Sequence, residues 1–260
     1  MRIMGRRAPK HVTAKENLCT RHLIVISLFI MLIAAGFLVY AHSINVHKWF
    51  SFNERVVPGY NLWMSVSGVP CSVFLKPWGD GLLGFNITEN LGWGVSAVVP
   101  EVADLSNGST VSVNLTAGGS GLPFFVYTIT VDIYTPAVLG GNLSFNLQSC
   151  SFKATDLDAR GVYVYVGLGD VYVNLTSPLN HAAYSVVTQT GDILMALPAG
   201  QGFAVNATTV NGEIHIKGAN LATLIHNNQN VYGIVGGGGP HIYLASVDGS
   251  ITIETYPQNS

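Results

Sequence analysis

Apolar and polar residues alternate along most of the chain from Pro58 onward, and no stretch there shows the 3.6-residue periodicity of a long helix. In "VSVNLT" the apolar residues Val111, Val113 and Leu115 fall on one face, and "DVYVNL" and "NLSFNL" repeat the pattern. Because successive side chains of a strand point to opposite faces, these segments predict half-buried β-strands. The sequence therefore predicts an all-β domain over residues 58–256.

Four glycines mark a repeat in the second half of the chain. Gly169, Gly191, Gly212 and Gly249 are separated by 22, 21 and 37 residues, and each precedes a polar residue and two apolar residues, as in "GDVYV" and "GEIHI". A period near 21 is typical of repetitive β-architectures. It fits a β-solenoid or β-helix with glycine at each corner. It also fits a β-sandwich of hairpins, because Asn-Gly and Asp-Gly favour two-residue hairpin turns.

A single long apolar segment, residues 23–41, carries no charge over nineteen residues. As a helix it would just cross the hydrocarbon core of a bilayer. Six of the twelve Lys and Arg residues precede it, which by the positive-inside rule keeps the N-terminus in the cytosol. We therefore expect a signal anchor of a single-pass cell-membrane protein, with the C-terminal domain extracellular. A cleaved signal peptide is the alternative, although its apolar region would be shorter.

This interpretation divides the chain into four parts. We expect a basic cytosolic tail over 1–21, a transmembrane helix over 22–42, a juxtamembrane connector over 43–57 and the all-β ectodomain over 58–256, with regular repeats over about 125–256. From His42 onward six bases face thirteen acids, a net charge of about −7. A nucleic-acid binder would concentrate bases on its folded part, so no nucleic-acid partner is expected.

Cysteines and sequons agree with export. Cys71 and Cys150 are the two cysteines beyond the apolar segment, and they predict one disulfide, with two buried free thiols as the alternative. Six Asn-x-Ser/Thr sequons also follow that segment, and most place Asn on the polar face of a predicted strand or in a turn. The expected glycosylation sites are Asn86, Asn107, Asn114, Asn142, Asn174 and Asn206.

The C-terminal stretch "GGGGPHIYLASVDGSITI" resembles the ending of a large family of uncharacterised bacterial and archaeal surface proteins described as adhesins. "YTITVDIYTP", "TQTGDILMALP" and "TTVNGEIHIKG" resemble the central strand and the internal repeats of that family, so the resemblance covers about residues 125–256. It implies β-solenoid-like repeats, and it favours the solenoid over the sandwich. It also implies a non-catalytic, adhesin-like role.

The sequence offers few candidates for chemistry. The glycine run Gly236–Gly239 is followed by "PHIYLAS", a predicted strand, so it is interpreted as a bend and not as a phosphate loop. Asp170, Asp192 and Glu213 follow the corner glycines and could stack as a column, an acid pair or a weak Ca²⁺ site, but exposed corners favour polar residues anyway. Ser250 would break this column. We expect no catalytic residues, no metal and no cofactor.

Three functional hypotheses follow. The favoured one is a membrane-anchored, glycosylated adhesin-like or envelope-structural protein, whose partners would be the membrane through residues 23–41 and a surface glycan or a neighbouring envelope protein. It predicts an exposed aromatic or apolar patch on one side of the solenoid. The second is a subunit of a surface filament that donates a strand from residues 43–57. The third is a polysaccharide-acting β-helix enzyme. Trp63, Trp78 and Trp93 are further candidates for stacking against a carbohydrate.

Overall fold

The computed structural model describes residues 24–35, 44–51, 60–78, 83–91, 101–105, 110–116, 128–136, 139–176, 181–218 and 221–257. The chain forms two compact units, residues 1–43 and 44–260. Each unit is described by itself. Asn107, Trp93 and Asp80 lie outside the described residues.

The first unit contains a helix over residues 24–35. A transmembrane helix was predicted over 22–42, and residues 22, 23 and 36–42 of that range lie outside the described residues. Among the described residues, no helix is both long and apolar enough to span a membrane. The predicted localisation as a single-pass membrane protein anchored by residues 23–41 is therefore corrected.

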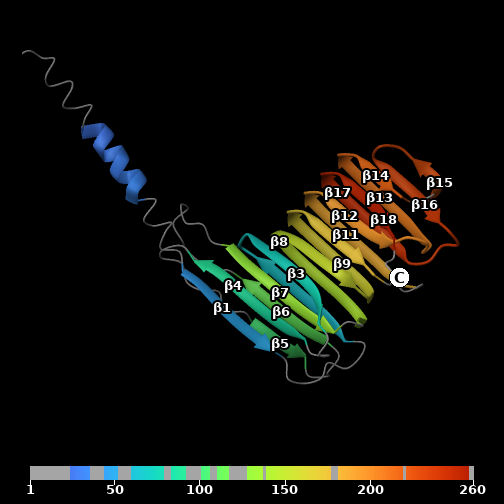
Figure 1. Cartoon of the computed structure of the whole chain (residues 1–260), viewed down its shortest axis with the longest axis horizontal. Helices are drawn as coiled ribbons and strands as arrows, with labels where there is room; N and C mark the ends of the chain where they lie inside the picture. Colours follow the sequence, from blue (N-terminus) through green and yellow to red (C-terminus); the bar gives the residue numbers. More distant parts are fainter. Residues whose placement is uncertain are drawn as a thin grey trace, which may run out of the picture. The chain divides into compact units, whose positions relative to one another are not determined.

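The second unit consists of strands that form two sheets joined through the long, bent strand β8 (Figure 1). In sheet A the strands lie in the following order: β1 (Ile44–Ser51), β4 (Gly84–Leu91), β7 (Thr128–Pro136), β3 (Cys71–Trp78), the second half of β8 (Leu139–Leu157), β10 (Val171–Leu175), β12 (Ile193–Pro198), β18 (Ile251–Tyr256) and β14 (Ile214–Lys217).

Sheet B contains the other strand of each repeat. Its strands lie in the order β5 (Glu101–Leu105), β6 (Thr110–Thr116), β2 (Asn61–Ser67), the first half of β8, β9 (Ala159–Leu168), β11 (Ala183–Thr190), β17 (His241–Asp248), β13 (Phe203–Asn211), β16 (Asn230–Val235) and β15 (Leu221–His226).

Successive strands of a repeat alternate between the two sheets, so that β9 in sheet B leads to β10 in sheet A, and β11 to β12. All neighbouring strands from β6 to β13 in sheet B and from β7 to β14 in sheet A are parallel. A hairpin can only give antiparallel pairs. The all-β prediction is thus confirmed, the strand pairing is solenoid-like, and the alternative of a sandwich of hairpins does not hold.

The coils do not stack in chain order. The coil formed by β17 and β18 (241–256) lies between the coil 183–198 and the coil 203–217, although it follows both in the chain. At the other end, β2 and β3 likewise lie between the coil of β6 and β7 and that of β8. The spacing of 37 residues before Gly249 reflects the hairpin of β15 and β16, which covers the outer edge of β13.

The core lies between the two sheets and is built from the apolar residues that alternate along each strand. Examples are Val162, Val164 and Val166 of β9, each at most 2% exposed. Cys71 of β3 and Cys150 of β8 are register partners on adjacent parallel strands, and they form the predicted disulfide with 4.4 Å between their Cα atoms. The link joins coils that are 79 residues apart in the chain.

The predicted corner glycines stack on one another in the order Gly169, Gly191, Gly249 and Gly212, which we call the glycine column. A Cβ atom added to Gly191 would lie 2.5 Å from the carbonyl carbon of Gly169, and one added to Gly249 would lie 2.6 Å from that of Gly191. Real Cβ atoms do not approach backbone this closely. The column therefore requires glycine, because the backbones of successive coils meet at the corner.

Hydroxyl groups strengthen the same corner from inside. Thr188, Ser246 and Thr209, each three residues before a glycine of the column, are buried. Their hydroxyls donate hydrogen bonds of 3.3, 3.1 and 2.8 Å to the carbonyls of Gly169, Gly191 and Gly249, respectively. Each hydroxyl thus links its own coil to the coil before it in the stack. The hydroxyl and the glycine carbonyl satisfy each other's hydrogen-bonding capacity.

Candidate functional site

The outer face of sheet B carries the surface feature that stands out most in the described part of the chain. At one height across eight neighbouring strands, small polar and aromatic residues alternate: Ser112, Trp63, Ser144, Tyr163, Ser185, Tyr243, Asn206 and Tyr232. We call its four rings, Trp63, Tyr163, Tyr243 and Tyr232, the aromatic row. They are 42%, 41%, 43% and 44% exposed.

The positions of the rings follow from the strand pattern. In β9 the segment "VYVYV" places its valines in the core, so Tyr163 and Tyr165 point outward. Register pairing then sets Tyr163 beside Ser144 on one side and beside Ser185 on the other. Because each neighbour is small, a ring has room to spread over the sheet, which is consistent with its being about 40% exposed and not fully exposed.

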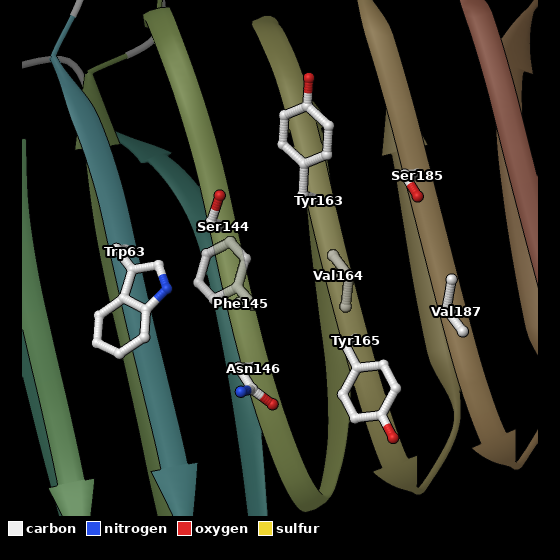
Figure 2. Close-up of a pocket in the computed structure, with 9 residues that line it drawn as sticks. All are labelled: Trp63, Ser144, Phe145, Asn146, Tyr163, Val164, Tyr165, Ser185 and Val187. Atoms are coloured by element: carbon white, nitrogen blue, oxygen red, sulfur yellow. The ribbon is translucent and has the colours of Figure 1, made fainter.

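A shallow hollow of about 170 Å³ lies at this face (Figure 2). Trp63, Tyr163 and Tyr165 border it, and the small residues Ser144, Asn146, Ser185 and Val187 form its outer floor. The Nε2 atom of Gln189 donates a 2.7 Å hydrogen bond to the hydroxyl of Tyr165, which fixes that ring's tip. The hollow is smaller than the 300–1,000 Å³ typical of enclosed ligand pockets, so it suits a ligand that lies along the surface.

A second row of outward-facing residues, two positions further along each parallel strand, also lacks charged side chains. It runs through Asn114, Ser65, Asn146, Tyr165, Val187, Ala245, Thr208 and Asn230. Neither row contains Asp, Glu, Lys or Arg; the exposed Arg160 and Asp248 lie outside the two rows, at the ends of β9 and β17. His241, at the start of β17, is the ionisable imidazole on this face.

Sheet A is charged by contrast. The Lys76 Nζ atom lies 2.9 Å from an oxygen of Asp132, and this hydrogen bond raises the pKa of Lys76 above its ordinary value. Lys76 also lies 5.4 Å from the ring centre of Phe74, and Lys153 lies 5.3 Å from that of Tyr172. Burial raises the pKa of Tyr172, as does the nearby carboxylate of Glu254. Phe74 and Tyr172 of sheet A thus each lie beside a lysine, whereas the rings of the aromatic row face outward.

The predicted acid column serves the backbone of the corner. An Asp170 oxygen accepts a hydrogen bond of 2.9 Å from the amide of Asp192, and an Asp192 oxygen accepts one of 2.7 Å from the amide of Ser250. Ser250 lies between Asp192 and Glu213, as its hydrogen bond of 3.4 Å from the amide of Glu213 shows. Asp192 and Glu213 are therefore two coils apart, and they do not converge on one point.

Other candidates lie apart from one another. Among the described residues, no group of three or more His, Cys, Asp or Glu side chains could hold a metal ion. Asp158 is half-buried, which raises the pKa of its carboxyl group, and Asp156 lies in β8 with a positive φ of 54°. The run Gly236–Gly239 ends at strand β17, so its interpretation as a bend is confirmed.

Five of the six predicted glycosylation sites are described. Asn114, Asn142 and Asn206 are exposed on the outer face of sheet B. Asn206 lies in line with the aromatic row, between Tyr243 and Tyr232. Asn86 and Asn174 belong to sheet A and are half-buried, and the Oδ1 atom of Asn174 is buried. Their glycosylation stays a prediction.

Of the three tryptophans considered for carbohydrate stacking, Trp63 lies on the outer face of sheet B, and Trp78 packs edge-on against Tyr134 in sheet A, with 5.7 Å between ring centres. Sequence reasoning missed Tyr163, Tyr232 and Tyr243. The outward parity of Tyr163 and Tyr165 in "VYVYV" was a usable signal, but their alignment with Trp63 depends on the pairing of strands about 100 residues apart.

Residues 132–254 match the family model described as Toastrack DUF4097. The resemblance to the adhesin-like family of uncharacterised surface proteins is thus confirmed. No curated protein matches the chain.

Solved structures give a similar picture of the fold. A "putative cell adhesion protein" from Clostridium sporogenes covers 82% of this chain and 100% of its own, with a TM-score of 0.57 at 11% identity. A "putative adhesin" from Bacteroides fragilis covers 82% and 97%, with a TM-score of 0.35 at 15% identity. Another from Parabacteroides distasonis covers 83% and 98%, with a TM-score of 0.26 at 15% identity. The first of these supports a shared fold.

Proposed function

We propose that this protein is a non-catalytic, adhesin-like binding module that uses the outer face of sheet B. The observation that carries the proposal is the contrast between the two sheets. Sheet B presents five half-exposed rings, the four of the aromatic row and Tyr165, in two rows without charged residues, whereas Phe74 and Tyr172 of sheet A lie beneath lysines. Exposed apolar patches of this kind mark interaction sites, because covering them removes apolar surface from water.

The corner carboxylates argue against the alternative of a polysaccharide-acting enzyme. A glycosidase needs one carboxylate free to protonate and a second one free to attack or to activate water. Here Asp170 and Asp192 each accept a backbone amide of the next coil. Glu213 is exposed and lies 3.6 Å from His215 at the surface. The acids thus serve the stacking of coils.

Strand donation is not favoured either. The proposed donor segment included residues 44–51, which form β1 and pair in antiparallel register with β4 of the same chain. N-glycosylation at Asn86, Asn107, Asn114, Asn142, Asn174 and Asn206 remains part of the proposal. Exposed side chains at Asn114, Asn142 and Asn206 support it.

The proposal is tested by retention of the purified protein on insoluble cell-wall preparations and on whole cells. The triple variant Trp63→Ser, Tyr163→Ser, Tyr243→Ser removes three rings of the aromatic row. Its matched control, Phe74→Ser, Tyr134→Ser, Tyr172→Ser, removes three rings from sheet A. We expect retention to be lost in the first variant and kept in the second, with both remaining folded by far-UV circular dichroism. Retention by the first variant, or its loss only in the second, would refute the proposal.

A further inference from the structure

We infer that the aromatic row binds an extended, electrically neutral polysaccharide, which lies across the strands along the direction in which the coils stack. The inference rests on the proposed function, because it names the ligand class of the same face. The sugar rings would stack on Trp63, Tyr163 and Tyr243.

The spacing of the rings supports a polymer with a short repeat. Neighbouring strands lie about 4.8 Å apart, so rings on every second strand repeat at roughly 9.6 Å. An extended β-linked glycan advances by a similar length for each pair of sugar units. One chain could therefore place every second sugar over a ring, while the sugars between them face Ser144 and Ser185.

The orientation of the rings suits sugars as well. Figure 2 shows the outer face of sheet B, and Trp63, Tyr163 and Tyr165 present the broad sides of their rings to the viewer. A pyranose has a face of axial C–H bonds that packs against such a ring, and its equatorial hydroxyls point sideways. The hydroxyl of Ser144 and the amide of Asn146 border the same hollow and can hydrogen-bond to them.

The absence of charge selects among polymers. None of the residues in the two rows that carry and flank the rings is acidic or basic, and the exposed Arg160 and Asp248 lie at the ends of β9 and β17. An anionic polysaccharide or a nucleic acid would be desolvated here without a counter-charge, whereas a neutral glycan has no charge to desolvate. Binding should therefore depend little on salt concentration.

A proline-rich peptide is the competing occupant. In the polyproline II conformation it repeats after three residues, roughly 9.3 Å, so spacing alone does not exclude it. Such peptides dock in grooves lined by aromatic rings. The face here holds a shallow hollow of about 170 Å³ with rings spread over the sheet, which favours the flat face of a sugar.

Three predicted glycosylation sites, Asn114, Asn142 and Asn206, lie on the outer face of sheet B and bear on the design of the test. Asn206 lies between Tyr243 and Tyr232, so a glycan there would cover that end of the row. The full-length chain should therefore be produced in a host without N-glycosylation. The probes are cello-oligosaccharides of two to eight sugar units, oligogalacturonates of equal length as the anionic control, and a decaproline peptide.

Isothermal titration calorimetry should show affinity for cello-oligosaccharides that rises with length as successive rings are covered, about two sugars to a ring. Tyr163→Ala should weaken binding of the hexaose roughly tenfold, whereas Tyr163→Phe, which keeps the ring, should change it less than about threefold. Tyr243→Ala should weaken the hexaose and octaose but leave the triose unchanged. Tyr172→Ala, on sheet A, is the matched control and should have no effect.

The inference is overturned if no cello-oligosaccharide binds, if oligogalacturonate binds as tightly, if decaproline binds instead, or if Tyr163→Phe behaves like Tyr163→Ala. The retention assay separates this outcome from failure of the proposed function. If loss of the aromatic row abolishes retention while the oligosaccharides do not bind, the face is right and the ligand class is wrong. If the row is dispensable for retention too, both proposals fail.

Discussion

The glycine column makes a quantitative prediction about stability, because it combines two separable effects at one residue. Gly191 has a φ of 140°, a region of backbone space that is accessible essentially only to glycine. In addition, a Cβ at this position would lie 2.5 Å from the carbonyl carbon of Gly169. Gly191→Ala should therefore suffer both backbone strain and a steric clash in the middle of the column.

The magnitude follows from these two contributions. Adopting such a φ costs an alanine about 1–3 kcal/mol, and overpacking a close contact costs about 1–3 kcal/mol more. We expect Gly191→Ala to lower the free energy of unfolding by about 3–5 kcal/mol. This is a large part of the 5–15 kcal/mol that holds a typical domain together. Binding by the aromatic row should be kept in the fraction that remains folded.

Three other glycines serve as matched controls. Gly167 has the clash without the positive φ, since its Cβ would meet the carbonyl oxygen of Gln148. Gly200 has a φ of 85° with no atom within 4 Å of the added Cβ, and Gly237 has neither constraint. Urea unfolding followed by circular dichroism should rank the destabilisation of the alanine variants as Gly191 greatest, Gly167 and Gly200 intermediate, and Gly237 near zero.

The design also defines the result that would refute it. If Gly191→Ala unfolds at the same urea concentration as Gly237→Ala, the coils do not meet at this corner as described. If Gly200→Ala and Gly191→Ala lose equal stability, the backbone conformation alone accounts for the cost. The close approach of Gly169 and Gly191 would then make no contribution to the loss of unfolding free energy.

Three further predictions concern other parts of the molecule. Replacing both Cys71 and Cys150 with Ser should lower the free energy of unfolding by about 4–5 kcal/mol, since the disulfide closes a loop of 79 residues; an unchanged urea midpoint would contradict this. Tyr60→Phe should raise the free energy of unfolding by about 1 kcal/mol, because the buried hydroxyl has no hydrogen-bond partner in the part of the chain that is described. Burial raises the pKa of Tyr60, so the wild type should lose stability as the pH rises above about 10, the pKa in the unfolded chain, and the Phe variant should lose less across a series of urea titrations at rising pH. Glycopeptide mapping should find higher sugar occupancy at Asn142 and Asn206 than at Asn174, whose Oδ1 is buried; equal occupancy at all three would count against the placement of Asn174.

Local patterns in the sequence were enough to predict many of the strands and the corners of the repeats, although β1 (Ile44–Ser51) lies in the predicted connector. Val171 and Val173 alternate with polar residues, and Gly169 precedes them, so both the strand and the corner are encoded within a few residues. The stacking order was not predictable in this way. Equivalent residues in each repeat look alike, and nothing local shows that the coil of Gly249 lies between those of Gly191 and Gly212.

The candidate site was predictable only in part. An exposed aromatic patch was expected on one side of the solenoid, and Trp63 was among the residues considered. The alignment of Trp63 with Tyr163 passes through Ser144 of β8, so it depends on the register of three strands brought together from distant parts of the chain. The hydropathy of residues 23–41 predicted a membrane anchor, whereas no helix among the described residues is long and apolar enough to span a bilayer.

The displaced coil has a consequence for how the protein is made on the ribosome. Residues 241–256 leave the exit tunnel after residues 183–198 and 203–217, yet they supply the backbone partners of both, including the amide of Ile251, which donates to the carbonyl of Glu213. Until they emerge, the coils 183–198 and 203–217 lack the strands that pair with both of them in the folded protein. At that stage of synthesis, the free strand edges are open to binding by a molecular chaperone or to pairing with the same edges of a second nascent chain.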